Sequence, residues 1–336
     1  MNHTLKATCE TVHYGGFSAE LPSALTVRSG DRIHVETFSG VPVYQSAPPE
    51  FVPPEFLDIC QHLPADRRIA AGPHLMTGPI DVEGAEPGDV LEIRLEEIKP
   101  SLPMGFTLMR PGAGALPQKF DQTVLRFTPI DLQAGAVEFP LGSGIILPLR
   151  PFFGILGVAT ADTQRHSVPP GDFGGNLDNR LLQAPCRLFL PVFLPGARFS
   201  IGDGHSVQGD GEACLTALET SMNGVIELRS HSHHSHPYLS DLPLPLAETT
   251  TDWITMGFGS TLDAAFEQCL ERMLTFLQRF VGMTADEAYM FCSLSVNFHI
   301  TQAVNLPTKG VHGCLPKAIL PKAFFSEAIF SEGIVP

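Results

Sequence analysis

The chain has 336 residues, with 31 glycines, 30 prolines and 43% hydrophobic residues. This hydrophobicity is too high for a disordered protein, and so many helix-interrupting residues argue against an all-helical bundle. Acidic residues number 36 and basic residues 21, which gives a formal charge of −15. An acidic chain without a basic stripe is not expected to bind nucleic acid or an anionic membrane surface, although it attracts cations.

Cysteine usage and the opening sequence predict a cytoplasmic protein. The seven cysteines form no CxxC pair and are odd in number, which favours a reducing compartment. The opening sequence, MNHTLKATCETVHYGG, has no basic segment followed by an apolar one, so no secretory signal is recognised. No apolar run approaches the roughly 20 residues of a membrane span.

Residues 1 to about 100 predict strands and turns. Turns at 29–31 and 87–89 each lead into a run in which apolar and polar residues alternate. A turn followed by a period-two run is typical of a half-buried strand. Between the two units, the proline-rich residues 44–73 predict a surface loop, with a lid as the functional alternative.

The middle of the chain continues this pattern. Short apolar runs separated by Gly, Pro, Asp and Asn predict strands, among them 187–192 and 212–219. Residues 231–258 predict irregular chain with strand fragments.

Helical spacing begins near residue 260. Apolar residues recur every three or four positions over 262–280, with a polar cap before them and Gly282 after them. Thr284-Ala-Asp-Glu287 is a capping box that predicts a second helix over 285 to about 294. The prolines that follow predict extended chain.

The elements together predict a mainly β protein with α-helices (α+β), in which sandwich-like layered sheets precede a C-terminal helical hairpin. We expect one domain over residues 1–336. Its parts would be a β-rich region at 1–258, a helical layer at 260–295 and an extended tail at 296–336.

The strongest candidate for chemistry is the segment 201–212, IGDGHSVQGDGE. Its acids, Asp203, Asp210 and Glu212, and His205 stand among small residues. Asp203 and His205 are two positions apart, so they face the same side of an extended segment. Carboxylates with an imidazole suit Zn²⁺ or another divalent ion. The alternative is a polar turn in which His205 makes ordinary hydrogen bonds.

Three other patches give weaker signals. Gly-Gly-Asn-Leu-Asp at 174–178 places Asn176 and Asp178 on one side of an extended backbone as oxygen ligands, although such residues also make ordinary turns. His74 precedes a Thr-Gly-Pro turn and is either functional or an ordinary turn residue. The tract HSHHSH at 231–236 has the composition of a metal tract, but it lacks acidic neighbours and predicts an exposed loop.

A nucleophilic mechanism has less support. The sequence contains no Gly-x-Ser-x-Gly elbow, and a cysteine nucleophile needs a base beside it in space. Cys214 follows Glu212 closely, but a cysteine in a strand usually behaves as a small buried hydrophobe.

Short motifs also occur in a characteristic order between about residues 13 and 322. They are TGPI at 77–80 with GAEPGD at 84–89, PFFGILGVA at 151–159, GGNLD at 174–178, GDGH at 202–205 with QGDGE at 208–212, EAYM at 287–290 and LPK at 315–317. Each motif is short, but their shared order is specific. In this order the chain resembles the acetamidase/formamidase family of metal-dependent amide hydrolases.

The resemblance implies a layered β/β/α fold and hydrolysis of short linear amides, such as formamide and acetamide, to a carboxylate and ammonia. It also implies a divalent metal, expected to be Zn²⁺ with Ca²⁺ as a second ion, and a homo-oligomer, either a dimer or larger. The family motifs correspond here to His74, Asn176, Asp178, Asp203, His205, Asp210 and Glu212.

On this basis we expect the metal ligands to be Asp178, Asp203, His205, Asp210 and Glu36. Glu212 would carry protons, and His74 or Asn176 would support the oxyanion. Which of the acids is base and which is ligand stays open. In the family pattern an acid commonly follows the early Glu-Thr pair by one residue. Here Phe38-Ser39 follows Glu36-Thr37, so Glu36 would act without that acid.

Two other classes of function stay open. The same acids could form a structural ion site in a non-catalytic β protein that binds a metal or small ligand. Alternatively, the chain could be a thiol-dependent amidase that uses Cys214 or Cys186.

Overall fold

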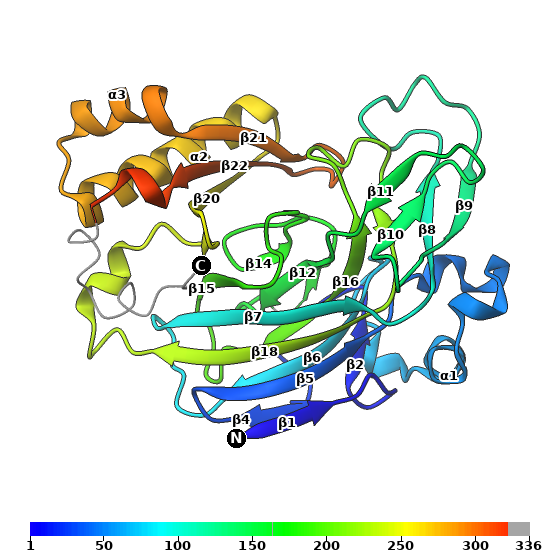
Figure 1. Cartoon of the computed structure of the whole chain (residues 1–336). Coiled ribbons are helices and arrows are strands. Elements are labelled where there is room, and N and C mark those ends of the chain that lie inside the picture. Colours follow the sequence, from blue (N-terminus) through cyan, green and yellow to red (C-terminus); the bar gives the residue numbers. More distant parts are fainter. Residues whose placement is uncertain (163, 322–336) are drawn as a thin grey trace.

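Two nine-stranded sheets dominate the computed structural model, which describes residues 1–162 and 164–321 (Figure 1). The first sheet, called the large sheet, is antiparallel except for its first pair. In spatial order its strands are β1 (Asn2–Leu5), β5 (Asp31–Thr37), β18 (Met222–His231), β7 (Val90–Pro100), β15 (Cys186–Pro191), β19 (Leu246–Glu248), β20 (Asp252–Gly259), β22 (Lys309–Pro316) and β21 (Asn297–Gln302).

The second sheet, called the site sheet, curls over one face of the first. Its main path is β14 (Gly174–Asn176), β12 (Phe152–Val158), β16 (Phe199–Val207), β17 (Leu218–Glu219), β8 (Met104–Met109) and β9 (Val124–Pro129). A branch at β16 adds β6 (Leu75–Val82), which pairs in turn with β2 (Val12–Tyr14) and β4 (Leu25–Val27).

Two small pairs and several helices complete the described chain. The pairs are β10 (Ala136–Glu138) with β11 (Ile146–Pro148) and β3 (Gly16–Phe17) with β13 (Arg165–His166). The helices are α1 (Pro54–His62), α2 (Leu262–Phe276) and α3 (Ala285–Ser295), with short 3-10 turns η1 (Val41–Ser46), η2 (Pro49–Phe51), η3 (Ala65–Arg67), η4 (Pro237–Asp241) and η6 (Lys317–Ile319) and a π turn η5 (Leu277–Val281).

The main hydrophobic core lies between the two sheets. The alternation of apolar and polar residues that predicted strands also shows which side chains enter this core. In β5, Ile33 and Val35 are buried, while His34 between them is exposed. They pack in one cluster with Phe153 of β12 and Ile201 of β16, which belong to the site sheet. The mainly β prediction and the two turn-strand units are confirmed.

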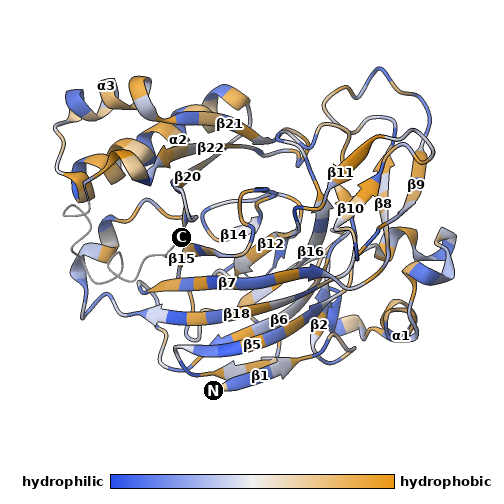
Figure 2. Cartoon of the chain, viewed as in Figure 1, coloured by the Kyte–Doolittle hydropathy of each residue, from blue (hydrophilic) through white to orange (hydrophobic). Residues whose placement is uncertain are grey.

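Helix α2 lies on the end of the large sheet formed by β20 and β22, and α3 packs against α2 (Figure 1). Gly257 allows close contact, because a Cβ there would meet the α2 backbone at 2.1 Å. Thr261 caps α2, Gly282 ends the helical stretch with φ 83°, and Thr284 forms the expected capping box at α3. Figure 2 shows hydrophobic and hydrophilic residues on both helices. The helical hairpin is confirmed.

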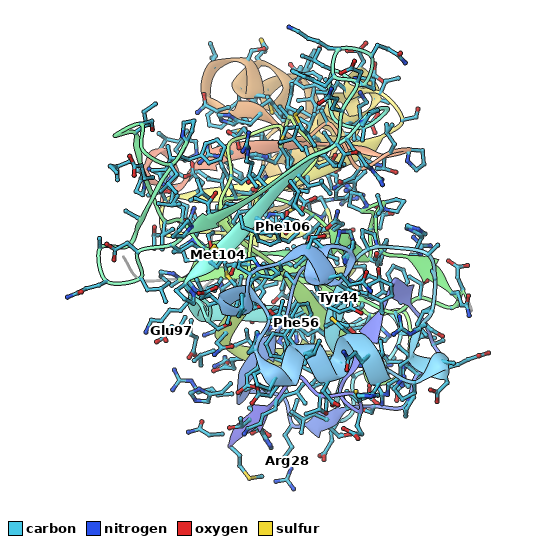
Figure 3. All side chains as sticks on the ribbon, turned by 90° about the vertical axis from the view of Figure 1, so that its right-hand side faces the viewer. Arg28, Tyr44, Phe56, Glu97, Met104 and Phe106 are labelled. Atoms are coloured by element: carbon cyan, nitrogen blue, oxygen red, sulfur yellow. The ribbon has the colours of Figure 1, made fainter. Side chains whose placement is uncertain are left out.

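Residues 44–73 correct the loop prediction, because they contain α1, the 3-10 turns η2 and η3 and the end of η1. Helix α1 has a proline, Pro54, at its first position, where proline favours a helix. Its Phe56 and Ile59 are buried, and this burial explains why the segment is helical. Their cluster includes Phe106 of β8, with Met104 and Tyr44 packed against it. In Figure 3, Tyr44, Phe56, Met104 and Phe106 lie on the side of the molecule that carries α1.

Residues 212–219 also differ from the prediction. Only Leu218–Glu219 form a strand, because Glu212 and Leu215 adopt φ values of 46° and 127°, which a strand does not tolerate. Residues 231–258 contain more regular structure than predicted, with β19 and β20 both in the large sheet. Within the described residues, no helix is both long and apolar enough to cross a bilayer. The expected extended tail is described only to residue 321.

Candidate active site

Strand β12 brings the first candidate residues together. It lies between β14 and β16, and its Ile155 is opposite Asn176 on one side and Gly202 on the other. Asp178 follows β14 and donates its N–H to the Gly154 carbonyl at 3.2 Å. Two segments that are about 25 positions apart in the sequence therefore place Asp178, Asp203 and His205 at one point.

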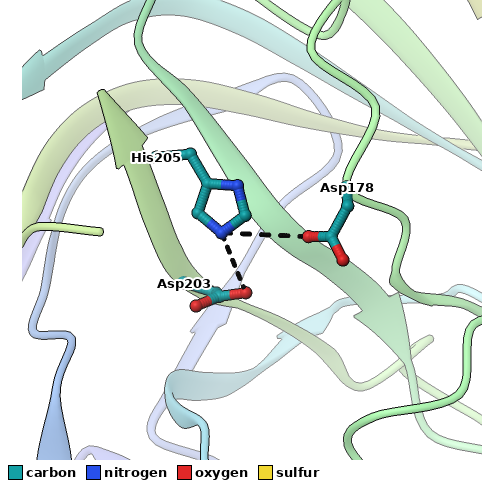
Figure 4. Close-up of side chains that lie close together, drawn as sticks. All are labelled: Asp178, Asp203 and His205. Carbon is teal, nitrogen blue, oxygen red and sulfur yellow. Dashed lines mark ion pairs between the residues drawn. The ribbon is translucent and has the colours of Figure 1, made fainter. Parts of the chain in front are cut away.

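Five buried side chains converge there; we call Asp178, Asp203, His205, Glu212 and Glu219 the acidic cluster. Nε2 of His205 lies 3.2 Å from Glu219 Oε2, 3.3 Å from Asp203 Oδ2 and 3.8 Å from Asp178 Oδ1. Figure 4 shows a ring nitrogen of His205 facing both the Asp178 and the Asp203 carboxylates. Asp178, Asp203 and Glu212 have φ values of 47°, 59° and 46°. Three left-handed acids at one point indicate a conformation that is held by its surroundings.

Polar neighbours hold the cluster in place. Gln208 Oε1 accepts a hydrogen bond from His205 Nδ1 at 2.7 Å, and Gln208 Nε2 donates to the Asp178 carbonyl at 2.8 Å. With Nδ1 bonded to Gln208, the Nε2 atom of His205 faces the carboxylates. Asn305 Nδ2 donates to Asp178 Oδ2 at 2.5 Å.

His74 lies at the edge of the cluster. Its Nε2 is 3.8 Å from Asp203 Oδ2, and its Nδ1 is bonded to the buried Ser167 hydroxyl at 2.8 Å. His74 and Asn176 both line the cavity described below. The structure thus places both expected oxyanion-supporting residues beside the cluster.

Burial shifts the pKa values of the cluster acids. It raises the pKa of Asp178 to about 6 and that of Glu219 to about 7, and it raises the pKa of Glu212 well above its usual range with help from the charge of Asp178. Burial alone would also raise the pKa of Asp203, but His74 and His205 outweigh it and lower that pKa. Glu219 and Asp203 similarly overcome burial to raise the pKa of His205.

The residues present fit a divalent cation. Four buried atoms here make no hydrogen bond: Asn176 Oδ1, Asp178 Oδ1, His205 Nε2 and Glu212 Oε2. Unpartnered buried acceptors are costly unless something satisfies them. A Cβ on Gly154 would lie 2.6, 2.7 and 2.9 Å from ligand atoms of Asp178, Asp203 and His205, so only glycine leaves this point free. Carboxylate oxygens with one imidazole suit Zn²⁺ or a harder cation.

A cavity of about 600 Å³ leads from the cluster toward β8. Asp178, Asp203, Glu212 and Glu219 contribute to its polar end. The remaining wall is largely apolar and includes Val43, Leu75, Phe106, Leu108, Leu215, Val304 and Leu306. The site therefore combines polar groups with an apolar pocket, as small-molecule sites commonly do.

Two expected ligands are not in the cluster. Asp210 binds Arg180 with both carboxylate oxygens, at 2.7 and 2.8 Å, so its charge is already paired. Glu36 alternates with buried Val35 and therefore lies on the other face of β5, next to Asn223 of β18 in the register. For Asp210 and Glu36, the structure corrects the expectation of a place in the site.

Two residues of the site were missed by the sequence argument. Glu219 enters because β17 pairs with β16 and sets it opposite His205, and Asn305 comes from the far end of the chain. The only local signal for Glu219 is an acid at the end of the apolar run 213–218. The residues next to Glu219 do not indicate which strand pairs with it, and the residues next to Asn305 do not indicate that it reaches the site.

The histidine tract has acidic partners, contrary to the expectation. His231 Nε2 is bonded to Glu92 Oε2 at 2.6 Å, and His233 Nδ1 to Asp89 Oδ1 at 2.8 Å. Both partners come from or just before β7, about 140 positions away in the sequence. The tract is a surface segment fixed by ion pairs and hydrogen bonds, and it is not part of the acidic cluster.

Comparison with known proteins identifies the family. The model of the Acetamidase/Formamidase family matches residues 66–167 and 159–322, which is most of the chain. The chain belongs to this family. The formamidase of Methylophilus methylotrophus is 23% identical, with 70% of this chain and 74% of that protein covered.

Solved structures of the acetamidase/formamidase family have the same fold. The acetamidase of Bacillus halodurans superimposes with a TM-score of 0.78 at 27% identity, over 93% of this chain and 97% of that one. The acetamidase of Yersinia enterocolitica gives a TM-score of 0.80 at 25% identity, over 96% of this chain and 94% of that one. The motif order in the sequence therefore identified the family correctly.

Proposed function

We propose that this member of the family is a metal-dependent amidase that hydrolyses linear amides to a carboxylate and ammonia. The observation that carries the proposal is the acidic cluster, in which four buried carboxylates and His205 converge. Because no lysine or arginine forms an ion pair with these carboxylates among the described residues, the expected partner is a bound cation. Family membership supports amides as the substrate class.

A bound divalent cation supplies polarisation of the amide carbonyl and acidification of the attacking water. Asp178, Asp203 and His205 would hold it, since their ligand atoms surround the point left free by Gly154. Gln208 and Asn305 keep His205 and Asp178 in the required orientation.

Glu212 would transfer the proton. Its Oε2 is buried without a hydrogen-bond partner, and the residue lines the cavity next to the cluster. A cation bound in the cluster would favour the ionised form of Glu212. As a carboxylate it would take the proton from water and pass it to the amide nitrogen, which otherwise leaves poorly. His74 and Asn176, on the cavity wall, would donate hydrogen bonds to the carbonyl oxygen as negative charge develops on it.

The test is the variant Glu212→Gln. We expect it to retain bound metal by elemental analysis and to release ammonia from formamide and acetamide at least about 100-fold more slowly, as expected when a general base is lost. Glu97→Gln, an exposed acid of β7, is the matched control and should keep full turnover. Full turnover by a metal-containing Glu212→Gln protein would remove Glu212 from the mechanism.

The competing classes make different predictions. Cys186 is fully buried and burial raises its pKa, which disfavours the nucleophilic thiolate. Cys214, expected in a strand as a buried residue, is instead exposed and lies before β17. We expect a chelator to abolish turnover while the protein stays folded, and a thiol-alkylating reagent to have little effect. Activity lost to alkylation but not to chelation would support the thiol mechanism. Loss of the fold on chelation, with no turnover beforehand, would support a structural ion site.

A further inference from the structure

The cavity beside the acidic cluster is much larger than the amides named for the family. Even if each of the four non-hydrogen atoms of acetamide took about 30 Å³, the share of one water in the liquid, the whole molecule would fill about 120 Å³. The cavity measures about 600 Å³. Cavities of roughly 300–1,000 Å³ hold ligands of drug size. Most of the volume is therefore available to a part of the substrate beyond the amide group.

The chemistry of the wall indicates what that part is. The carboxylates lie at the cluster end of the cavity, whereas β8 contributes Phe106 and Leu108, and η1 contributes Val43. Uncharged and imidazole side chains also belong to the polar part of the lining, among them Ser39, His74, His166, Asn176, Thr216 and Asn305. Arg110 is the one lysine or arginine that lines the cavity among the described residues, and it is exposed to solvent. The described lining therefore contains no buried lysine or arginine that could hold an anionic substituent, so the wall suits an uncharged apolar group.

This apolar wall is held by packing. The ring of Phe106 makes edge contacts with Phe51 at 5.6 Å between centroids, and Phe51 also contacts Phe127 of β9. Phe51 and Phe56 are fully buried in the same cluster. The segment predicted as a loop or lid thus supports one side of the cavity as packed structure. A pocket formed before the substrate arrives binds without the cost of ordering its wall.

We propose that the preferred substrate is a primary amide with an uncharged apolar acyl group of about six carbons or an aromatic ring, and that formamide and acetamide are poor substrates. This inference rests on the proposed amidase function and specifies its substrate class. Each methylene placed against the wall contributes about 0.8 kcal/mol, or about fourfold in kcat/KM. Four added methylenes therefore predict that hexanamide exceeds acetamide by roughly two orders of magnitude.

The first experiment measures ammonia release by the metal-loaded protein from acetamide, butanamide, hexanamide and benzamide. We expect kcat/KM to rise with acyl size. In protein treated with chelator, which separates binding from turnover, hexanamide should raise the melting temperature more than acetamide does. A constant or falling kcat/KM along the series would overturn this inference and leave the amidase proposal intact. Turnover of no amide at all would instead contradict the amidase proposal.

A matched pair of variants locates the effect. Leu108 and Leu125 are opposite each other on β8 and β9, and both pack against the same cluster, but only Leu108 lines the cavity. Leu108→Ala should lower the ratio of kcat/KM for hexanamide to that for acetamide about tenfold or more, since it removes several contacting carbons. Leu125→Ala should leave the ratio unchanged while costing similar stability. Equal ratios in the two variants would show that the β8 wall does not contact the acyl group.

Discussion

Two groups of buried acidic side chains among the described residues differ in their partners. One is the acidic cluster. The other, which we call the ion-pair network, lies on the large sheet and contains Glu92, Glu248, Arg187 and Lys317. Arg187 contacts Glu92 at 3.1 Å and Glu248 at 2.6 Å, and Lys317 contacts Glu248 at 2.6 Å. The acids of the network are paired with Arg187 and Lys317. Among the described residues, the four acids of the cluster have only His205 and the neighbouring His74 as basic partners.

The difference appears in the pKa values. Burial alone would raise the pKa of Glu92, but the bond from His231 and the charges of Arg187 and Arg94 lower it to about 2. In the cluster, burial raises the pKa of Asp178 and Glu219. Buried acids with internal cations thus keep their charged form in the folded state, whereas the acids of the cluster lack such cations, which is why we propose a cation from solution there.

The largest effect is expected from Arg187→Met. It leaves Glu92 and Glu248 buried with part of their positive charge removed, so the free energy of unfolding should fall by about 3–5 kcal/mol. Urea unfolding measures this change. Arg32→Met, which breaks an exposed pair with Glu96 on the same sheet, is the control and should change stability little. Similar losses in both variants would show that burial does not distinguish the network.

The second prediction concerns pH. The pKa of Glu92 is about 2 in the folded protein, and its ordinary value is 4.5. Below pH 4.5, Glu92 is therefore protonated in the unfolded chain while it stays ionised in the folded one. The contribution of Glu92, about 3 kcal/mol, is therefore complete above pH 4.5 and disappears as the pH falls toward 2. Unfolding measured along this range should show a smaller loss in Glu92→Gln. An unchanged slope in this variant would contradict the lowered pKa.

The third prediction concerns the cluster. Adding a divalent cation at about 100 times its dissociation constant should raise the free energy of unfolding by about 2.7 kcal/mol. Asp203→Asn should lose most of this rise in the free energy of unfolding. Asparagine tolerates the φ of 59° at this position, so the variant should fold normally. Calorimetric unfolding with Zn²⁺ or Ca²⁺ measures both proteins. Equal stabilisation of the two would place the cation elsewhere.

The smallest effect is expected from Gln208→Leu. Without the acceptor for His205 Nδ1, the imidazole loses its fixed orientation, and Zn²⁺ affinity should fall by about 10- to 100-fold. Titration calorimetry gives the affinity. Gln183→Leu removes a half-buried amide that donates to the Arg180 carbonyl, and this variant should leave the affinity unchanged. An unaltered affinity in Gln208→Leu would show that Gln208 does not position His205.

Local pattern predicted much of the fold. The alternation in β5 and β7 and the capping box at Thr284 depend on neighbouring residues, and the structure has these elements where they were expected. Residues 44–73 and 212–219 were predicted wrongly. In the first, burial of Phe56 against β8 outweighs the many prolines, and in the second, the left-handed acid Glu212 interrupts the strand.

The sequence by itself determined the family, the mainly β architecture and the pair Asp203 and His205, because residues two apart on a strand face the same way. Only the tertiary structure decided which other acids join them. The pairing of β17 with β16 places Glu219 opposite His205, and Asp210 is paired with Arg180 outside the cluster. Glu36 faces away from the core, and Gly154 leaves space for a cation. These contacts join segments far apart in the chain, and the charge balance of a buried acid depends on all its neighbours in space.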